Sequence, residues 1–247
     1  MEFIQFILRI LKADNFNYNN LDKKEKLILN MFYYELWQDT LEKSGFNNIE
    51  DSINKLKECH SLLNEVISIL EYNLENIDFK EKDIDLDYTC PLKLHCRYSM
   101  SEVLAAFGEY NLEYKAPFWQ GVKYLEDKKT DIFFVTLNKS EKDYSETTMY
   151  DDYAIDDEYF HWQSQSGTSD TSPTGQRYIN HESLNSNVVL FVRERKKVNG
   201  ITEPYYCLGT AKFVSYEGSK PMSLVWKLDN KMPEFIKKKA SGNVMVG

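Results

Sequence analysis

Cysteine is scarce in this chain, and its spacing excludes two classes of protein. The four cysteines, Cys59, Cys90, Cys96 and Cys207, are too few and too scattered for the disulfide framework of a secreted domain. Structural zinc sites bring their ligands in close pairs such as C-x₂₋₄-C, and the sequence has no such pair. We therefore expect reduced thiols, no bound metal and no cofactor.

Long apolar runs are also missing. No window approaches the roughly 18 consecutive apolar residues that a membrane-spanning helix needs. The opening segment MEFIQFILRILKADNF is apolar, but it lacks a basic start and a small-residue cleavage site, so we expect a helix rather than a signal peptide. A hydrophobic fraction of 42% is ample for a core. The sequence thus predicts a cytoplasmic protein with no membrane partner.

The net charge is −9, which argues against a protein that binds nucleic acid mainly through its overall charge. The charge is uneven, however. Acidic residues gather between Asp151 and Glu158, whereas basic residues gather at 193–197 and 237–239. A recognition module whose partner domains supply phosphate contacts is compatible with this distribution.

Apolar spacing divides the chain into a helical part and a β-rich part. Apolar residues at three-and-four spacing predict helices near 3–11, 22–43 and 49–76, and a capping box at Ser99 and Glu102 predicts another that ends at Gly108. From Asp131 the period becomes two. We expect strands at 132–137, 160–165, 188–194, 205–216 and 222–228, joined by turns that include 173–175 and 199–200. The predicted class is α+β, with a helical N-terminal region at 1–90 and a curved sheet or barrel at 91–247.

The segment from Met149 to Tyr178, MYDDYAIDDEYFHWQSQSGTSDTSPTGQRY, mixes large rings with amides, hydroxyls and turn formers. On a strand, Phe160, Trp162 and Ser164 share one face, and His161, Gln163 and Gln165 share the other. A surface that stacks a flat ligand and hydrogen-bonds its edge has this composition. The segment is therefore the candidate binding region.

From about His95 onward the chain resembles a known family. The motifs are HCRYSMSEVLAAFG, DIFFVTLNKSEKDYSETTMYDDYAI, FHWQSQS, SPTGQRYINH, VVLFVRE, YYCLGTAKFVSYEGSKPMSLVWKL and MPEFI. They resemble the C-terminal domain of unknown function of bacterial superfamily II helicases, many of which also carry a phospholipase-D-type nuclease. SauUSI-type restriction enzymes, which cut DNA with modified cytosines, look like members. The resemblance implies a fold similar to SRA and PUA-like barrels, and SRA-type barrels flip one base out of the duplex into a pocket.

Two motifs of such enzymes are missing from the sequence. It has neither the G-x-x-x-x-G-K-[ST] phosphate loop of the helicase motor nor an H-x-K-x₄-D nuclease signature. The resemblance therefore implies a separate, non-catalytic target-recognition module for 5-methylcytosine or 5-hydroxymethylcytosine. Its expected partners are modified double-stranded DNA and the superfamily II helicase and nuclease domains of the same or a partner chain.

A flipped cytosine needs rings that stack on it and an acceptor for its N4 amine. The predicted base pocket is Tyr150, Asp152, Tyr153, Phe160, Trp162 and Tyr178. The predicted DNA contacts are Lys139, Ser140, His161, Gln163, Gln165 and Arg177, the last filling the gap left by the base or holding a phosphate. Plainer roles stay open: Phe160 and Trp162 as core residues, and the two glutamines as partners of nearby backbone.

A protein-interaction module is the alternative function. On this hypothesis the β-rich part docks onto a superfamily II helicase, the helical region provides the seam, and the acidic balance pairs with a basic motor domain. A stand-alone hydrolase is disfavoured, because no carboxylate comes with a metal ligand or nucleophile that the sequence identifies.

Overall fold

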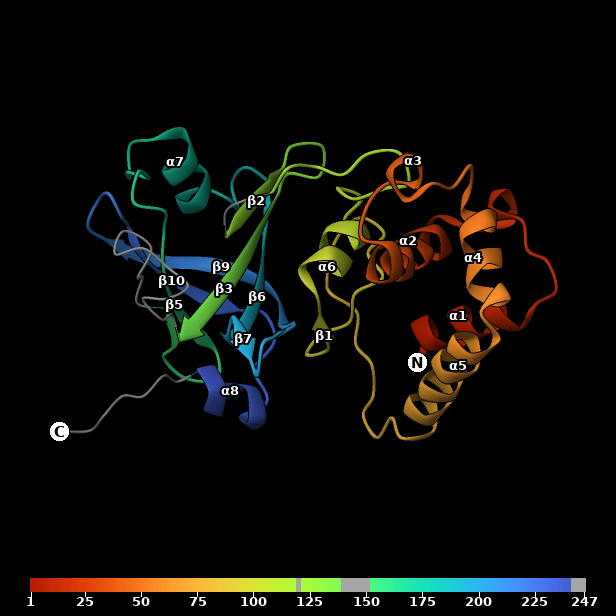
Figure 1. The fold of residues 1–247 in the computed structure, drawn as a ribbon. Helices are drawn as coiled ribbons and strands as arrows, with labels where there is room; N and C mark the ends of the chain where they lie inside the picture. Colours follow the sequence, from red (N-terminus) through yellow and green to blue (C-terminus); the bar gives the residue numbers. More distant parts are fainter. Residues whose placement is uncertain (119–120, 139–151, 241–247) are drawn as a thin grey trace. The chain divides into compact units, whose positions relative to one another are not determined.

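The computed structural model describes residues 1–118, 121–138 and 152–240 (Figure 1). The chain divides into two compact units. The helical unit comprises Met1–Asp83, Asp87–Lys93 and Met100–Pro117, and the β unit comprises Ile84–Leu86, Leu94–Ser99 and Phe118–Gly247. The predicted boundary at residue 90 falls within one of the helical unit's segments, because the chain passes between the units more than once.

The helical unit holds a short 3₁₀ turn and six α-helices within the described residues. Its elements are α1 (Glu2–Lys12), η1 (Tyr18–Asn20), α2 (Lys23–Trp37), α3 (Leu41–Ser44), α4 (Ile49–Glu58), α5 (His60–Glu75) and α6 (Met100–Ala106). A capping box between Asp22 and Glu25 starts α2. Two predicted long helices are each split in two. Gln38, with a left-handed φ of 62°, ends α2, and Cys59 separates α4 from α5.

The β unit is built on one mixed sheet with the strand order β2-β3-β6-β9-β10-β5-β4, and β1 pairs with β9. The strands are β1 (Arg97–Tyr98), β2 (Val122–Leu125), β3 (Thr130–Asn138), β4 (Tyr153–Ala154), β5 (Tyr159–Gln163), β6 (Asn187–Arg195), β9 (Tyr205–Glu217) and β10 (Ser223–Leu228). The β3–β6 pair is parallel, and the other pairs of this sheet are antiparallel. The five predicted strands and the α+β class are confirmed.

Of the two arrangements predicted for the strands, the barrel is wrong. Among the described residues, β2 and β4 end the sheet and do not pair with each other, so it is not closed. These edge strands are short, with four and two residues. Short edge strands expose few unpaired backbone N–H and C=O groups, so an open sheet gives another chain little to pair with.

Two short helices and a hairpin complete the β unit. The helices α7 (Pro173–Ile179) and α8 (Glu234–Ala240) lie at opposite ends of the sheet (Figure 1). Residues 173–175, predicted as a turn, instead open α7, because Ser172 caps it and Pro173 fits the first helical position. The hairpin of β7 (Lys197–Val198) and β8 (Ile201–Thr202) turns at Asn199 and Gly200, as predicted, and both have positive φ.

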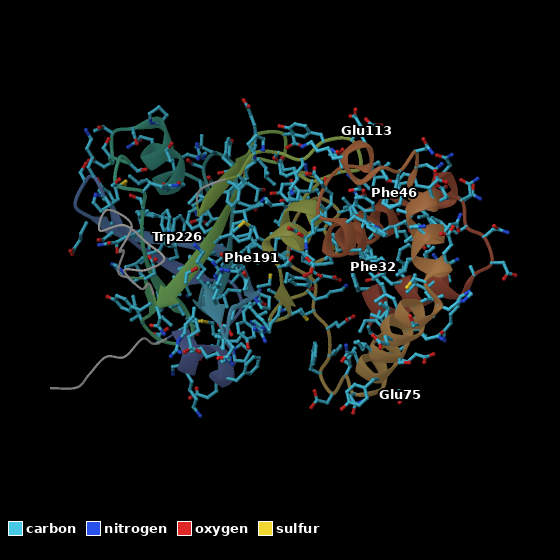
Figure 2. All side chains as sticks on the ribbon, in the orientation of Figure 1. Phe32, Phe46, Glu75, Glu113, Phe191 and Trp226 are labelled. Carbon is cyan, nitrogen blue, oxygen red and sulfur yellow. The ribbon has the colours of Figure 1, made fainter. Side chains whose placement is uncertain are left out.

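The core of the β unit is rich in rings. Trp226 lies among the strands (Figure 2) and is fully buried, as are Phe133 and Phe160. Helix α7 adds Tyr178 to this cluster and α8 adds Ile236. Burying one such apolar side chain contributes about 1.5–3 kcal/mol. The side chains of β5 and β10 that form this core are not available to a ligand. Only the side chains on the opposite faces of these two strands can bind one.

Candidate nucleic-acid interface

Three rings predicted to hold a base lie inside the core. Phe160 and Tyr178 are 0% exposed and Trp162 is 5% exposed. Trp162 stacks on Phe133 with ring centroids 4.1 Å apart, and Tyr178 meets Trp162 edge-on at 5.5 Å. The prediction that these three rings line an open base pocket is wrong, because all three are buried in the core of the β unit. The core role left open for Phe160 and Trp162 is the one they have.

Two polar atoms lie inside this ring cluster. Among the described residues, the Tyr178 hydroxyl and the Trp226 Nε1 have no hydrogen-bond partner. Burial raises the pKa of Tyr178 above its ordinary value. An unsatisfied buried group costs about 1–3 kcal/mol, so each of these two atoms lowers the stability that its ring contributes to the core.

Arg177 is held by a buried carboxylate. Its Nε and Nη2 donate to the two Asp131 carboxylate oxygens at 2.7 and 2.8 Å, and its guanidinium lies 3.8 Å from the Tyr124 ring centroid. Asp131 is 0% exposed. Burial raises the pKa of Asp131, although the Arg177 guanidinium acts to lower it. This bidentate pair anchors α7 to β3 and leaves the Arg177 side chain 19% exposed, so the DNA contact by Arg177 stays a prediction.

Asp152 is also engaged within the protein. It is 8% exposed, and its Oδ1 accepts the backbone N–H of Gln163 at 2.9 Å. This bond ties the residues before β4 to the end of β5. One carboxylate oxygen thus already has a backbone donor, and the contact of Asp152 with a cytosine amine stays a prediction.

The predicted polar face of β5 does point away from the core. His161 and Gln163 are partly exposed, whereas Phe160, Trp162 and Ser164 are buried. The Gln163 amide donates to the Ser223 hydroxyl at 3.3 Å, and the Gln165 side chain accepts from the Thr168 hydroxyl at 3.3 Å. The alternation is confirmed, and both glutamines have protein partners.

Tyr153 and His161 form a ring pair on this outer side of the sheet. Tyr153 is 37% exposed, and its ring stacks on His161 with centroids 4.7 Å apart and planes 16° apart. The two residues are cross-strand partners on β4 and β5. Unlike the buried rings, this pair presents aromatic surface to solvent.

The sheet continues this surface across β10. Tyr159, His161 and Gln163 stand opposite Lys227, Val225 and Ser223, and these six are all partly or fully exposed. Lys227 Nζ lies 5.7 Å from the Tyr159 ring centroid. We call this set, with Tyr153, the outer face; its members are Tyr153, Tyr159, His161, Gln163, Ser223, Val225 and Lys227.

Sequence reasoning missed four members of the outer face. Tyr159, Ser223, Val225 and Lys227 carry a usable signal, since each alternates with a buried neighbour on its strand. What the sequence did not contain was the antiparallel register that sets β10 beside β5. The predicted residues Lys139, Ser140 and Tyr150 lie outside the described residues.

The described residues contain neither a cluster of metal-binding side chains nor a membrane-spanning helix. Among them, three or more His, Cys, Asp or Glu side chains nowhere gather so that they could hold a metal ion. Within the same residues, every helix is too short or too polar to cross a membrane.

Comparison with known families gives one match. Residues 92–239, more than half of the chain, match the family described as Domain of unknown function (DUF3427). No curated protein matches the chain. The matched range includes every residue of the outer face.

Proposed function

Because the chain belongs to the family of domains of unknown function DUF3427, we propose its function from its own side chains and motifs. We propose that it is a non-catalytic target-recognition module that binds double-stranded DNA and recognises 5-methylcytosine or 5-hydroxymethylcytosine by base flipping. It would act for a superfamily II helicase and nuclease, as the resemblance to SauUSI-type enzymes implies.

The observation that carries this proposal is the exposed ring pair on the outer face. Tyr153 and His161 lie nearly parallel, 4.7 Å apart, with the Gln163 amide on the same side of β5. Exposed rings on an open sheet are the platforms on which many proteins stack bases, and a nearby amide can bond a base edge.

The energies set what such a face can achieve. Extruding a base costs a few kcal/mol, and stacking on one ring returns about 1–3 kcal/mol. The 5-methyl group adds about 0.8 kcal/mol when it is buried. Affinity would therefore depend mainly on the rings, with a preference for methylated DNA of a few-fold.

The test is fluorescence anisotropy with one duplex in unmodified and 5-methylated form. The double variant Tyr153→Ala/His161→Ala should bind at least tenfold more weakly than the wild type. The matched control is Tyr72→Ala/His60→Ala, which removes the same two exposed residue types from α5. If the wild type binds both duplexes equally weakly, the protein does not recognise the modification. If the two double variants bind with equal affinity, the outer face is not the DNA-binding surface.

Helix α5 favours the alternative, a docking module. None of its residues is fully buried, and its apolar side chains are partly or largely exposed, with Ile69 at 59% and Tyr72 at 66%. Exposed apolar stripes of this kind mark interaction sites. The helix carries three glutamates and no lysine or arginine, so a second copy would bring like charges together. Charge complementarity therefore favours a partner with an apolar groove edged by basic residues.

A purified superfamily II helicase motor of a SauUSI-type enzyme is the probe for this alternative. Calorimetric titration should detect binding that Ile69→Glu abolishes, and the DNA affinity of that variant should stay unchanged. Undiminished binding by Ile69→Glu would exclude α5 as the docking helix.

A further inference from the structure

The described residues contain a second exposed surface, at the end of the sheet where β6 leads into the β7–β8 hairpin. Six cationic side chains surround it, and we call them the basic patch: Arg97, Arg195, Lys196, Lys197, Lys238 and Lys239. They come from β1, β6, the β6–β7 junction, β7 and α8. Helix α8 and β7 lie at the same end of the β unit (Figure 1).

Glu203 holds the strand side of the basic patch together. Its carboxylate lies 3.7 Å from Arg97 Nη2 and accepts the backbone N–H of Arg195 at 3.4 Å. Its own backbone N–H donates to the Lys196 carbonyl at 3.1 Å. The buried side chain of Arg193 also holds Glu203 in place, since its Nη1 donates to the Glu203 carbonyl at 3.1 Å. The hairpin that carries Lys196 and Lys197 is thus positioned by bonds at its base.

Tyr206 contacts cations from both α8 and β1. Lys239 Nζ lies 5.4 Å from the Tyr206 ring centroid and 3.3 Å from its hydroxyl, and the Arg97 guanidinium lies 5.3 Å from the same ring. Phe235, which is 53% exposed, packs edge-on against Tyr206 with centroids 5.9 Å apart. Arg97 therefore links the two halves, because it contacts both Glu203 and Tyr206.

The charge of this surface is opposite to that of the chain. Two carboxylates lie within these segments, Glu194 and Glu234, and Glu203 lies just after β8, against the six cations. The chain as a whole has a net charge of −9. Positive charge concentrated at one end of the β unit, on side chains such as Arg195, which is 61% exposed and lies 3.4 Å from the Glu194 carboxylate, orients an anionic ligand toward that end.

We propose that the basic patch is the surface that holds the DNA phosphate backbone. This inference rests on the proposed function and extends it, because the outer face has only Lys227 as a cation. Phosphates are bound by arginine and lysine without regard to sequence, while base contacts supply the selectivity. The Tyr206 and Phe235 rings add apolar surface for sugars or an unstacked base. A wide polyanion fits this arrangement, since the cations come from separate elements rather than converging on one point.

The experiment compares two double charge reversals in the full chain. Lys196→Glu/Lys197→Glu alters the basic patch, and Lys43→Glu/Lys55→Glu is the control. The control lysines are 67% and 62% exposed in the helical unit and carry the same change of charge. Affinity for an unmodified duplex is measured by anisotropy across a salt series. The patch variant should bind at least tenfold more weakly than the control at low salt. Its slope of log affinity against log salt should fall by about 0.9 for each phosphate that the variant no longer neutralises.

The outcomes separate the two proposals. If the wild type binds no duplex at all, the proposed function fails and the patch inference fails with it. If the wild type binds DNA but both double variants keep the same affinity and salt slope, only the patch inference fails. Vesicles containing phosphatidylserine form a second arm. Loss of vesicle binding in the patch variant with DNA affinity intact would assign the basic patch to membranes and overturn the inference.

Discussion

The Arg177–Asp131 ion pair allows the sharpest prediction about stability. The pair joins α7 to β3 through two hydrogen bonds of 2.7 and 2.8 Å, and Asp131 is completely buried. Replacing Arg177 with Met keeps most of the side-chain volume but leaves the carboxylate without its cation. The change therefore isolates the electrostatic role of Arg177.

The structure sets the size of the effect. Removing one partner of a buried ion pair costs about 3–5 kcal/mol, because the remaining charge is buried and uncompensated. The Arg177 side chain is 19% exposed, which favours the lower half of that range. The variant also lacks the guanidinium contact with the Tyr124 ring, and such contacts contribute about 0.5–1 kcal/mol at partly exposed sites. We expect Arg177→Met to lower the free energy of unfolding by about 3.5–5 kcal/mol.

Urea denaturation monitored by tryptophan fluorescence measures this loss. Asp131→Asn/Arg177→Met is the control, since it removes both charges and should recover more than half of the deficit.

The pH dependence of the stability deficit supplies a second readout. Burial raises the pKa of Asp131, and without Arg177 nothing in the pair opposes that rise. A group with a raised pKa in the folded state stabilises below its unfolded pKa, and that stability is lost as the pH rises through the folded pKa. The deficit of Arg177→Met should therefore shrink as the pH is lowered from about 7 toward about 4, near the unfolded pKa of an aspartate.

A deficit below about 1 kcal/mol would refute this reasoning, since an exposed pair contributes no more than that. So would a deficit that stays constant with pH, because Asp131 would then remain charged at a site where burial should neutralise it.

Two further predictions concern the β-unit core. Tyr178→Phe should leave the free energy of unfolding unchanged or raise it by about 1 kcal/mol, because the removed hydroxyl has no partner among the described residues. A loss above about 1 kcal/mol in urea denaturation would show that the hydroxyl does have a partner. Gly175→Ala should destabilise by about 2 kcal/mol or more, since its Cβ would lie 2.0 Å from the Ser169 carbonyl oxygen. An unchanged thermal midpoint would mean that the backbone at Ser169 yields freely.

The local pattern of the sequence was a good guide to the strands. Alternation alone placed Phe160 and Trp162 on one face of β5 and His161 and Gln163 on the other, because successive side chains on a strand point to opposite faces. The turn at Asn199 and Gly200 was equally readable, since both residues tolerate positive φ. The helix breaks at Gln38 and Cys59 were not, because neither residue is a helix breaker by type.

The candidate site was harder to predict, because its residues are distributed over distant segments. Composition favoured rings beside amides, but it did not reveal which side of β5 would face the core. The predicted pocket lay on the apolar side, and there Trp162 packs on Phe133 from another strand. Arg177 gave the same difficulty, since its partner Asp131 lies 46 residues earlier in the chain.

The amino-acid sequence by itself determined the α+β class, the strand positions and the two-faced character of β5, because propensity, period and turn chemistry act over a few neighbours. Only the tertiary structure decided which rings were sealed in the core, which carboxylate neutralised Arg177, and how cations from β1, β6, β7 and α8 came to share one surface. These outcomes depend on strand register and helix docking, which bring together side chains that no local pattern connects.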